Sequence, residues 1–180
     1  MTMIKKCLHV ALVLATVWSL GAQAALKVGA SAPDVVAPAA LGGKLTQFNL
    51  AQALKRGPVV LYFYPKAFTS GCTVEAHLFA EAMPQFEALR ATVVGMSNDN
   101  IETLQKFSLE ECRSKFAVAA DDGARFIKQY DVGLMLKPDM ADRVSYVIGQ
   151  DGRIAFVHVA LSPEGHVVET LKAVQKLQAR

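Results

Sequence analysis

Apolar residues along the chain fall into unbroken short runs and longer periodic segments, which indicates strands alternating with helices. The runs at 59–64 (VVLYFY) and 91–97 (ATVVGMS) lack polar alternation, as is typical of strands buried on both faces. Apolar residues spaced three or four apart follow each run and predict helices over 70–90 and 98–116. Pro84 lies inside the first helix and is expected to kink it.

The flanking segments predict two β-hairpins and a final helix. The LGGK at 41–44 reads as the turn of an N-terminal β-hairpin between short edge strands. A second hairpin is expected to turn at the two residues Asp151 and Gly152. After the second helix, the sequence predicts a short strand with a turn at 117–123 and a short helix at 123–132. The second hairpin follows at 143–160 and the last helix at 163–178.

The order strand–helix–strand–helix–hairpin–helix predicts one α/β domain. Strands joined by helices run parallel and those joined by a tight turn run antiparallel, so the central sheet should be mixed. Helices should cover both of its faces. The expected domain spans residues 25–180.

The first 24 residues have the layout of a secretory signal peptide. Two lysines precede an apolar stretch, and small residues at Ala22 and Ala24 offer a cleavage site. The alternative is a retained membrane anchor, but the stretch contains polar residues and falls short of about 20 apolar residues. Cys7 precedes the apolar stretch and should leave with the signal. The mature protein is therefore expected in the periplasm, without stable membrane association.

Composition and charge describe an ordinary globular protein. The chain is 52% hydrophobic and 19% charged. Removal of residues 1–24 takes away two lysines and no acid, so the formal net charge falls from +3 to +1. Because no cluster of Lys and Arg with interleaved aromatic residues stands out, nucleic-acid binding is not expected.

Cys72 is the candidate for chemistry. It follows the strand at 59–64, and the expected helix places it in a first turn, where free N–H groups and the helix dipole favour a thiolate. Pro65 ends the strand, Thr69 supplies a hydroxyl, and Gly71 permits close approach of a ligand to the backbone. A thiol that merely packs in the core is the alternative.

Several segments resemble one family. The stretch YPKAFTSGCTVEAH resembles the active-site segment of peroxiredoxins, Pro-x-x-x-Thr/Ser-x-x-Cys, with Pro65, Thr69 and Cys72 in the motif positions. It is most similar to the bacterioferritin-comigratory, or Q-type, subfamily. Three further segments resemble that subfamily in the same order: GMSNDNIETLQKF, AADDGARFIKQYDV and RVSYVIGQDGRI.

The resemblance implies a thioredoxin-like fold and thiol-dependent reduction of hydrogen peroxide and organic hydroperoxides. Cys72 is then the nucleophile that becomes a sulfenic acid. Thr69 hydrogen-bonds the thiolate or the peroxide, Pro65 covers the pocket, and Arg143 holds the sulfur and the peroxide oxygen. For Thr69 a simple helix cap, and for Arg143 a surface position, are the alternatives. No metal or organic cofactor is needed; the expected partner is a thioredoxin-like or other dithiol reductant, and the protein a monomer or weak dimer.

The chain departs from the subfamily at the second cysteine. Many Q-type members carry one five positions after the first, where this chain has His77. The remaining candidate for resolving the sulfenic acid is Cys112, which lies 40 positions after Cys72 in the expected second helix. Its helical position points toward the apolar face, so a buried structural cysteine is the alternative.

Two other functions can be weighed against the peroxidase. Thiol–disulfide exchange uses Cys-x-x-Cys, but the position three after Cys72 is Glu75. A periplasmic copper carrier would use Cys72, His77 or Cys112 as ligands, but such carriers usually hold two cysteines close in sequence. His77, His158 and His166 are isolated along the chain, and each is expected to be a surface or hydrogen-bonded histidine and not a ligand.

Overall fold

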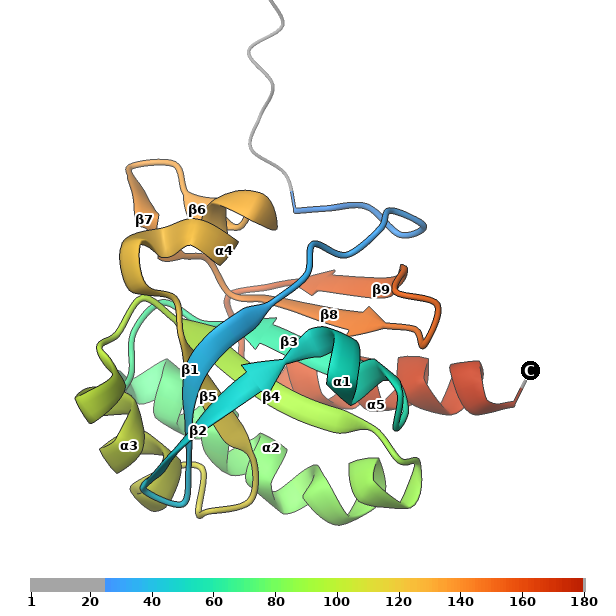
Figure 1. Ribbon diagram of the computed structural model, residues 1–180, viewed down its shortest axis with the longest axis horizontal. Helices are drawn as coiled ribbons and strands as arrows, with labels where there is room; N and C mark the ends of the chain where they lie inside the picture. The colour runs from blue at the N-terminus through green and yellow to red at the C-terminus, as the bar shows by residue number, and fades with distance from the viewer. Residues whose placement is uncertain (1–24, 180) are drawn as a thin grey trace, which may run out of the picture.

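The computed structural model describes residues 25–179, which form a seven-stranded sheet and a small two-stranded one. The predicted signal peptide at 1–24, with Cys7, lies outside the described residues. The large sheet has the strand order β2-β1-β5-β4-β3-β8-β9 (Figure 1). Its strands are β1 Val36–Leu41, β2 Lys44–Asn49, β3 Val59–Phe63, β4 Thr92–Ser97, β5 Ala117–Ala120, β8 Val144–Ile148 and β9 Ile154–Val159.

The sheet is mixed, as predicted. Its centre, β3, β4 and β5, is parallel, because helices connect these strands. The predicted N-terminal hairpin, β1 and β2, joins β5 in antiparallel orientation through β1. On the other side, β8 pairs antiparallel with β3 and β9 pairs antiparallel with β8. The last hairpin therefore lies directly beside the strand that leads to Cys72.

Helices cover both faces of the sheet (Figure 1). Successive side chains of β3 alternate between two core clusters, with Val60 and Tyr62 in one and Leu61 and Phe63 in the other. The first cluster lies under three helices: α2 Ser70–Ala88, α3 Ile101–Glu110 and α5 Glu164–Gln178. The second lies under α1 Leu50–Leu54 and α4 Arg125–Gln129. The remaining elements are a short 3-10 helix at Asp122–Ala124 and the small sheet, β6 Gly133–Leu134 and β7 Lys137–Ala141.

The predicted two-residue turn of the second hairpin is wrong. Gly149 and Arg153 close the hairpin, and Gly152 donates its N–H to the carbonyl of Gly149 across a β-turn. Gly152 then adopts a left-handed φ of 74°. A β-turn followed by a left-handed glycine gives a three-residue loop, which is the common alternative to a two-residue turn.

The second helix ends earlier than predicted. It spans Ile101–Glu110, so Cys112 follows the helix and does not lie in it. Arg113 and Ser114 have left-handed φ angles of 49° and 58°, which no α-helix accommodates. The chain reverses there without a glycine, so the usual sequence signal for a helix end is missing.

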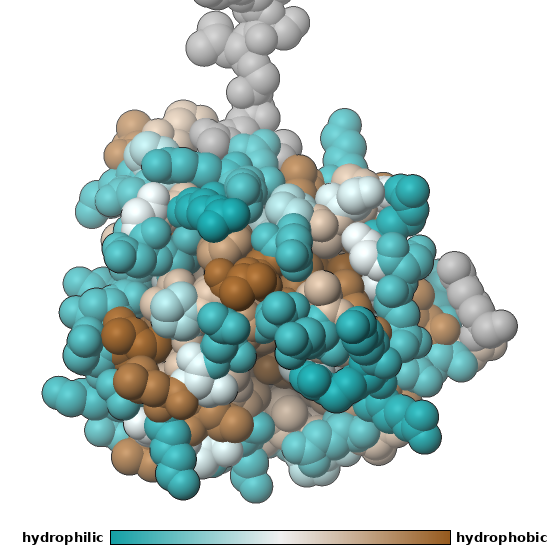
Figure 2. Space-filling model, viewed as in Figure 1, coloured by the Kyte–Doolittle hydropathy of each residue, from teal (hydrophilic) through white to brown (hydrophobic). Residues whose placement is uncertain are grey.

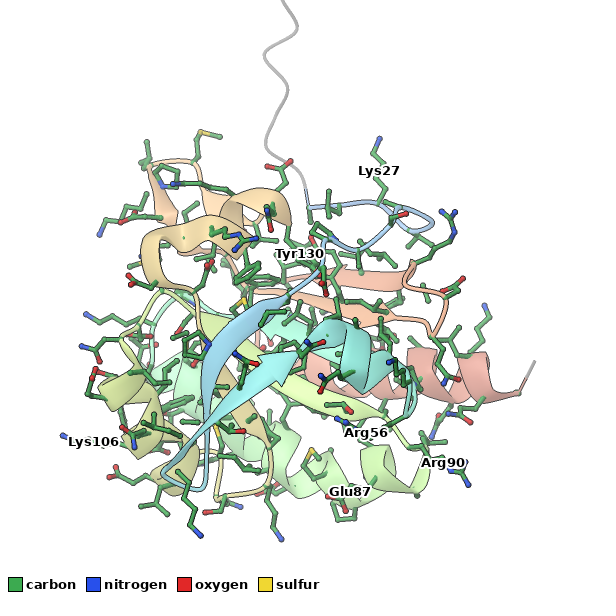
Figure 3. All side chains as sticks on the ribbon, viewed as in Figure 1. Lys27, Arg56, Glu87, Arg90, Lys106 and Tyr130 are labelled. Atoms are coloured by element: carbon green, nitrogen blue, oxygen red, sulfur yellow. The ribbon has the colours of Figure 1, made fainter. Side chains whose placement is uncertain are left out.

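Two buried tyrosines tie the N-terminal segment to the body. The Tyr130 hydroxyl donates to the carbonyl of Pro33 at 2.6 Å, and the Tyr146 hydroxyl accepts from the N–H of Leu26 at 3.0 Å. Figure 3 shows Tyr130 inside the molecule, whereas Lys27 and Lys106 point outward. The segment before β1 is therefore part of the packed domain.

Among residues 25–179, no helix is long and apolar enough to cross a membrane.

Figure 2 shows apolar side chains gathered over the turn of hairpin β1–β2 and the neighbouring end of α3. The exposed side chains there are Leu41, Leu45 and Leu109.

Candidate active site

Cys72 lies in the first turn of α2, where the sequence places it. The helix begins at Ser70 after Thr69, and the short segment 64–69 connects it to β3. The free N–H groups of this turn favour a negative charge. The thiol is nearly enclosed, with 2% of the residue exposed. Enclosure alone would also suit an inert core cysteine, so the neighbours of the sulfur decide its chemistry.

Arg143, which immediately precedes β8 and lies 71 positions after Cys72, approaches the sulfur. Its Nη2 lies 3.6 Å from Sγ of Cys72, and its Nε donates to the carbonyl of Leu161 at 3.1 Å. Sheet pairing explains the approach. Val144, the first residue of β8, pairs with Phe63, the last residue of β3. Arg143 is therefore held at the end of β3 from which the chain enters α2, and it is not a surface residue.

Gly71 makes room for this guanidinium. A Cβ at position 71 would lie 2.9 Å from Nη2 of Arg143, closer than Cβ contacts normally come. The glycine before the cysteine therefore makes room for the arginine side chain. The sequence suggested a different role, in which the glycine lets a ligand approach the backbone closely.

Thr69 and Pro65 lie on the connection between β3 and α2. The Thr69 hydroxyl donates to the carbonyl of Lys66 at 2.9 Å and, among the described residues, makes no hydrogen bond to the N–H groups of the first turn. Thr69 is exposed and occupies the N-cap position without capping through its side chain. Pro65 is half-buried and lines a polar hollow of about 470 Å³. The connection is anchored by Asp99, whose Oδ2 accepts from the N–H of Ala67 at 2.8 Å.

Glu75 is a site residue that the sequence pattern did not reveal as one. It lies one helical turn after Cys72, is 0% exposed, and its Oε2 accepts from Nη1 of Arg143. Burial raises the pKa of Glu75 to about 8, although Arg143 acts to lower it. Burial acts to lower the pKa of Arg143, but Glu75 and Cys72 outweigh it and raise that pKa. One guanidinium thus contacts a thiol and a carboxyl group.

A signal for Glu75 existed in the spacing. Residues three apart share a helix face, so Cys72 and Glu75 point to the same side of α2. The burial of that face depends on β8 and α5, which come much later in the chain.

Cys112 lies in the same core cluster as Cys72, fully buried beyond the end of α3. Burial, followed by the charge of Glu111, raises the pKa of the Cys112 thiol strongly. Both cysteines are free thiols in the described part of the chain. In this conformation Cys112 is protonated and enclosed.

The three histidines are not isolated in space. His77 pairs with Glu111 at 2.6 Å, and the rings of His158 and His166 meet edge to face with centroids 4.6 Å apart. Within residues 25–179, no group of three or more His, Cys, Asp or Glu side chains is placed to hold a metal ion.

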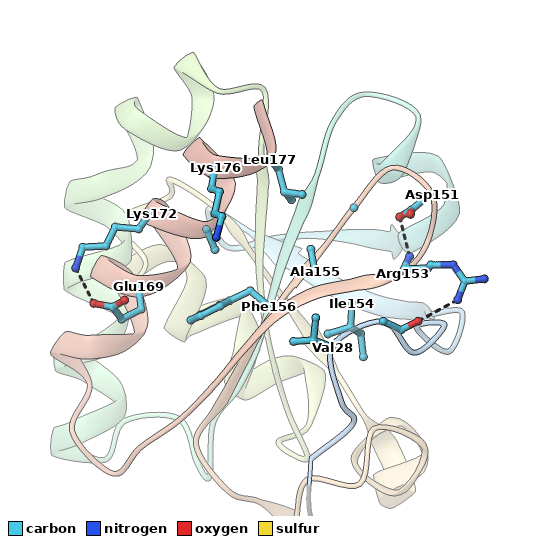
Figure 4. Close-up of a pocket in the computed structure, with 13 residues that line it drawn as sticks. Val28, Asp151, Arg153, Ile154, Ala155, Phe156, Glu169, Lys172, Lys176 and Leu177 are labelled. Carbon is cyan, nitrogen blue, oxygen red and sulfur yellow. Dashed lines mark hydrogen bonds and ion pairs between the residues drawn. The ribbon is translucent and has the colours of Figure 1, made fainter. Parts of the chain in front are cut away.

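One hollow lies away from the cysteine. It measures about 490 Å³ and lies between β9, α5 and the segment around Val28 (Figure 4). Phe156 and Ile154 contribute to its apolar part, while Lys176 lies at its rim. None of the five predicted site residues lines it, so the site is defined by the contacts of Cys72 and not by this hollow.

Comparison with known proteins gives consistent results. Residues 28–157 match the model of the AhpC/TSA family. A chloroplastic peroxiredoxin Q of Sedum lineare is 34% identical over 125 residues, which are 69% of this chain and 67% of that protein. The wheat (Triticum aestivum) peroxiredoxin Q is 33% identical over 124 residues, 68% of this chain, but the match spans only 57% of the wheat protein's length.

Solved structures agree with these matches. Peroxidoxin BcpB from Mycobacterium tuberculosis superposes with a TM-score of 0.76 at 31% identity, covering 84% of this chain and 98% of that one. A PrxQ variant of Xylella fastidiosa gives a TM-score of 0.74 at 28% identity, covering 85% and 98%.

These two relatives and two structures all carry peroxiredoxin-type names, which favour neither a copper carrier nor a thiol–disulfide exchange protein. The matched region contains Cys72, Cys112 and Arg143. The chain therefore belongs to the AhpC/TSA family of peroxiredoxins, which are peroxidase oxidoreductases with a thioredoxin-like fold.

Proposed function

We propose that this protein is a thiol peroxidase in which Cys72 reduces hydrogen peroxide and organic hydroperoxides. The observation that carries the proposal is the contact between Nη2 of Arg143 and Sγ of Cys72, at 3.6 Å, in the first turn of α2. A fixed positive charge and free N–H groups beside one sulfur stabilise its thiolate, which is the reactive form.

The reaction follows from this arrangement. The thiolate attacks one peroxide oxygen, an S–O bond forms, and the O–O bond breaks. The departing oxygen leaves with the bonding electron pair and takes up a proton, while the sulfur is oxidised to a sulfenic acid. Arg143 is placed to hold the sulfur and to stabilise the charge that moves onto the departing oxygen. The Thr69 hydroxyl donates to the carbonyl of Lys66, so its proposed role is to accept a hydrogen bond from the peroxide, and the proposed role of Pro65 is to cover the pocket.

Peroxide turnover with a dithiol reductant tests this proposal. Wild type should consume peroxide, and Cys72→Ser should lose the activity completely while keeping its fold. Activity retained in Cys72→Ser would contradict the proposal. Arg143→Met should slow the first oxidation by roughly 10²- to 10³-fold, the range measured when a group stabilising the departing oxygen is removed.

We further propose that Cys112 resolves the sulfenic acid as an intramolecular disulfide with Cys72. A disulfide requires the two Cα atoms within about 7 Å, so the first turn of α2 or the end of α3 must unwind locally. Residues 69 and 70 before Cys72 and residues 113 and 114 after Cys112 are exposed, and Cys112 lies two residues after the end of α3. Water leaves when Cys112 attacks the sulfenic acid, and an external dithiol, such as a thioredoxin-like protein, then returns the two electrons.

Intact mass after one equivalent of peroxide tests the resolution step. Wild type should lose two hydrogens, and Cys112→Ser should instead gain one oxygen. If wild type also gains oxygen without losing two hydrogens, the enzyme uses one cysteine and an external thiol. Sedimentation of the reduced protein tests the expected monomer or weak dimer.

We also propose that residues 1–24 direct export to the periplasm, on the basis of their charged, apolar and small-residue layout. N-terminal sequencing of the protein from a Gram-negative host should give a start near Ala25 in the periplasmic fraction. An uncleaved chain in the cytoplasm would contradict export.

A further inference from the structure

A buried polar cluster lies behind Arg143, on the side away from the sulfur. Glu75 of α2, Ser145 of β8 and His166 of α5 are all fully buried. Three elements far apart in sequence thus bring a carboxyl, a hydroxyl and an imidazole together. A function for this cluster rests on the proposed roles of Cys72 and Arg143.

The hydrogen bonds of His166 define its protonation. Nε2 lies 2.9 Å from the carbonyl oxygen of Ala160, which only accepts, so Nε2 carries a hydrogen. Nδ1 lies 2.8 Å from Oγ of Ser145. Burial, followed by the neighbouring His158 and Arg143, lowers the pKa of His166 to about 4. The ring is therefore neutral at pH 7, and its Nδ1, which carries no hydrogen, accepts from the hydroxyl of Ser145.

The second oxygen of Glu75 lies near the same nitrogen. Oε2 is occupied by Arg143, whereas Oε1 is buried and has no hydrogen-bond partner among the described residues. Nδ1 of His166 lies 3.8 Å from Oε1. This distance is beyond hydrogen-bond length, so Nδ1 does not accept a proton from Glu75 here. The electron-rich nitrogen would repel an ionised carboxylate, whereas it would not repel a protonated one. The neutral ring therefore favours the protonated carboxyl.

The charge balance of the cluster favours the same state. Arg143 carries one positive charge and contacts two acids, Glu75 and Cys72, in a region where all three are at least nine-tenths buried. Two buried anions beside one cation leave an unbalanced charge, which is costly in a region of low dielectric. One of the two acids should therefore keep its proton.

We propose that the neutral ring of His166 keeps the proton on Glu75, so that the charge of Arg143 is left to the Cys72 thiolate. His166 is a positioning residue, because it acts through Glu75 and Arg143 and does not touch the sulfur. Ser145 acts in the opposite direction, since its hydroxyl competes with Glu75 for Nδ1.

Other titratable groups also face this cluster. Around His166 these are Glu75 on α2, Arg143 and Asp142 before β8, and His158 on β9. Tyr62 on β3 also lies close enough to Glu75 for the carboxylate charge to raise its pKa, after burial and other neighbours. Tyr62 stays protonated, so it adds no charge at neutral pH.

Infrared spectroscopy of the reduced protein tests the state of Glu75 without any peroxide. At pH 7 wild type should show the carbonyl stretch of a protonated carboxyl, and Glu75→Gln should lack it. If the two spectra coincide in that region, Glu75 is ionised and the proposal is overturned.

The pH dependence of Cys72 alkylation by iodoacetamide tests the coupling. In His166→Leu the midpoint of the profile should move up by about one pH unit, the usual effect of a nearby charge that is gained or lost. In Glu75→Gln the midpoint should fall or stay, because the competing anion is gone, and adding His166→Leu to this variant should cause no further shift. A rise in Glu75→Gln, or a His166 effect that persists there, would overturn the proposal.

Ser145→Ala gives a second test if His166→Leu fails to fold. Removing the hydroxyl frees Nδ1 for Glu75, so the midpoint should move down, which mere loosening of the site would not produce. An unchanged or raised midpoint contradicts the proposal. His77→Leu is the matched control, because His77 pairs with Glu111 and should leave the midpoint unchanged. Alkylation needs no peroxide, so failure here is distinguishable from failure of the peroxidase proposal.

Discussion

Arg143 illustrates how much one residue decides in this molecule. Its three nitrogens contact the sulfur of Cys72, the carboxyl of Glu75 and the carbonyl of Leu161. A lysine would keep the charge but could not make three directed contacts from one planar group. The planar guanidinium thus links the first turn of α2 to the segment after β9.

Gly71→Ala should disturb this group without touching the thiol. The new Cβ would meet Nη2 of Arg143 at 2.9 Å, so the guanidinium must shift away from the sulfur. We expect the first oxidation of Cys72, followed by stopped-flow fluorescence, to slow by roughly 10- to 100-fold, since small misplacements cost that much. Ser70→Ala, at the neighbouring exposed position, should keep the wild-type rate. An unchanged rate in Gly71→Ala would mean that Arg143 is not needed where it lies.

At this scale the sequence predicted local features better than distant ones. The position of Cys72 in a first turn follows from the strand and helix patterns around it. Glu75 and His166 were not identified as members of one cluster, because their contact depends on how α5 packs against α2. An acidic residue on a helix reads as solvent-exposed until its neighbours in space are known.

At the scale of elements, the connection between β3 and α2 depends on Asp99. Oδ2 of this side chain accepts from the N–H of Ala67 and from Oγ of Ser97, both at 2.8 Å. It thereby joins the connection to the end of β4. The segment that carries Pro65 and Thr69 is thus held from the neighbouring strand.

Asp99→Ala should loosen that connection. Loss of the acceptor leaves two donors unpaired, and we expect unfolding in urea to show a loss of about 1–3 kcal/mol. Peroxide oxidation of Cys72 should slow as well. Asn98→Ala removes an exposed neighbour and should change neither quantity. If both variants behave alike, Asp99 does not hold the connection.

The segment after α3 stores backbone strain next to Cys112. Arg113 and Ser114 both have left-handed φ angles, a conformation that disfavours residues with a Cβ. Ser114→Gly should therefore raise the free energy of unfolding by about 1 kcal/mol. Glu110→Gly, in the last turn of the helix, should lower it by about as much. Thermal denaturation of the two variants checks the opposite signs, and destabilisation by both would exclude strain at Ser114.

Elements were predictable where apolar runs are long, and less so at their ends. The buried strands and the helices follow from periodicity and run length. The end of α3 and the loop at Gly152 could not be predicted in this way, because residues in the left-handed conformation define them. At Arg113 and Ser114, no glycine in the sequence marks that conformation.

At the scale of the whole molecule, the buried proton of Glu75 should appear in the stability profile. The folded state raises the pKa of Glu75 from 4.5 to about 8. Its contribution to stability is thus fully present below pH 4.5 and is lost as the pH rises toward and through 8. The free energy of unfolding of wild type, relative to Glu75→Gln, should therefore fall between pH 4.5 and 8.

Urea unfolding at several pH values measures this difference. His166 acts in the other direction: its pKa is lowered from 6.5 to about 4, so its contribution is present above pH 6.5 and lost as the pH falls through 4. Because both proteins contain His166, subtraction removes that effect. Glu87→Gln, at an exposed position, is the control. A flat difference for Glu75→Gln would show that the carboxyl ionises normally.

The separation of Cys72 and Arg143 by 71 positions has a consequence for biosynthesis. A chain emerging from the ribosome completes α2 long before the arginine exists, and α5 with His166 comes later still. Under the proposed role of Arg143, Cys72 should therefore stay a poor nucleophile until the last hairpin docks beside β3. Misfolded or truncated chains would neither compete for peroxide nor accumulate oxidised sulfur, so reactivity itself reports that assembly is finished.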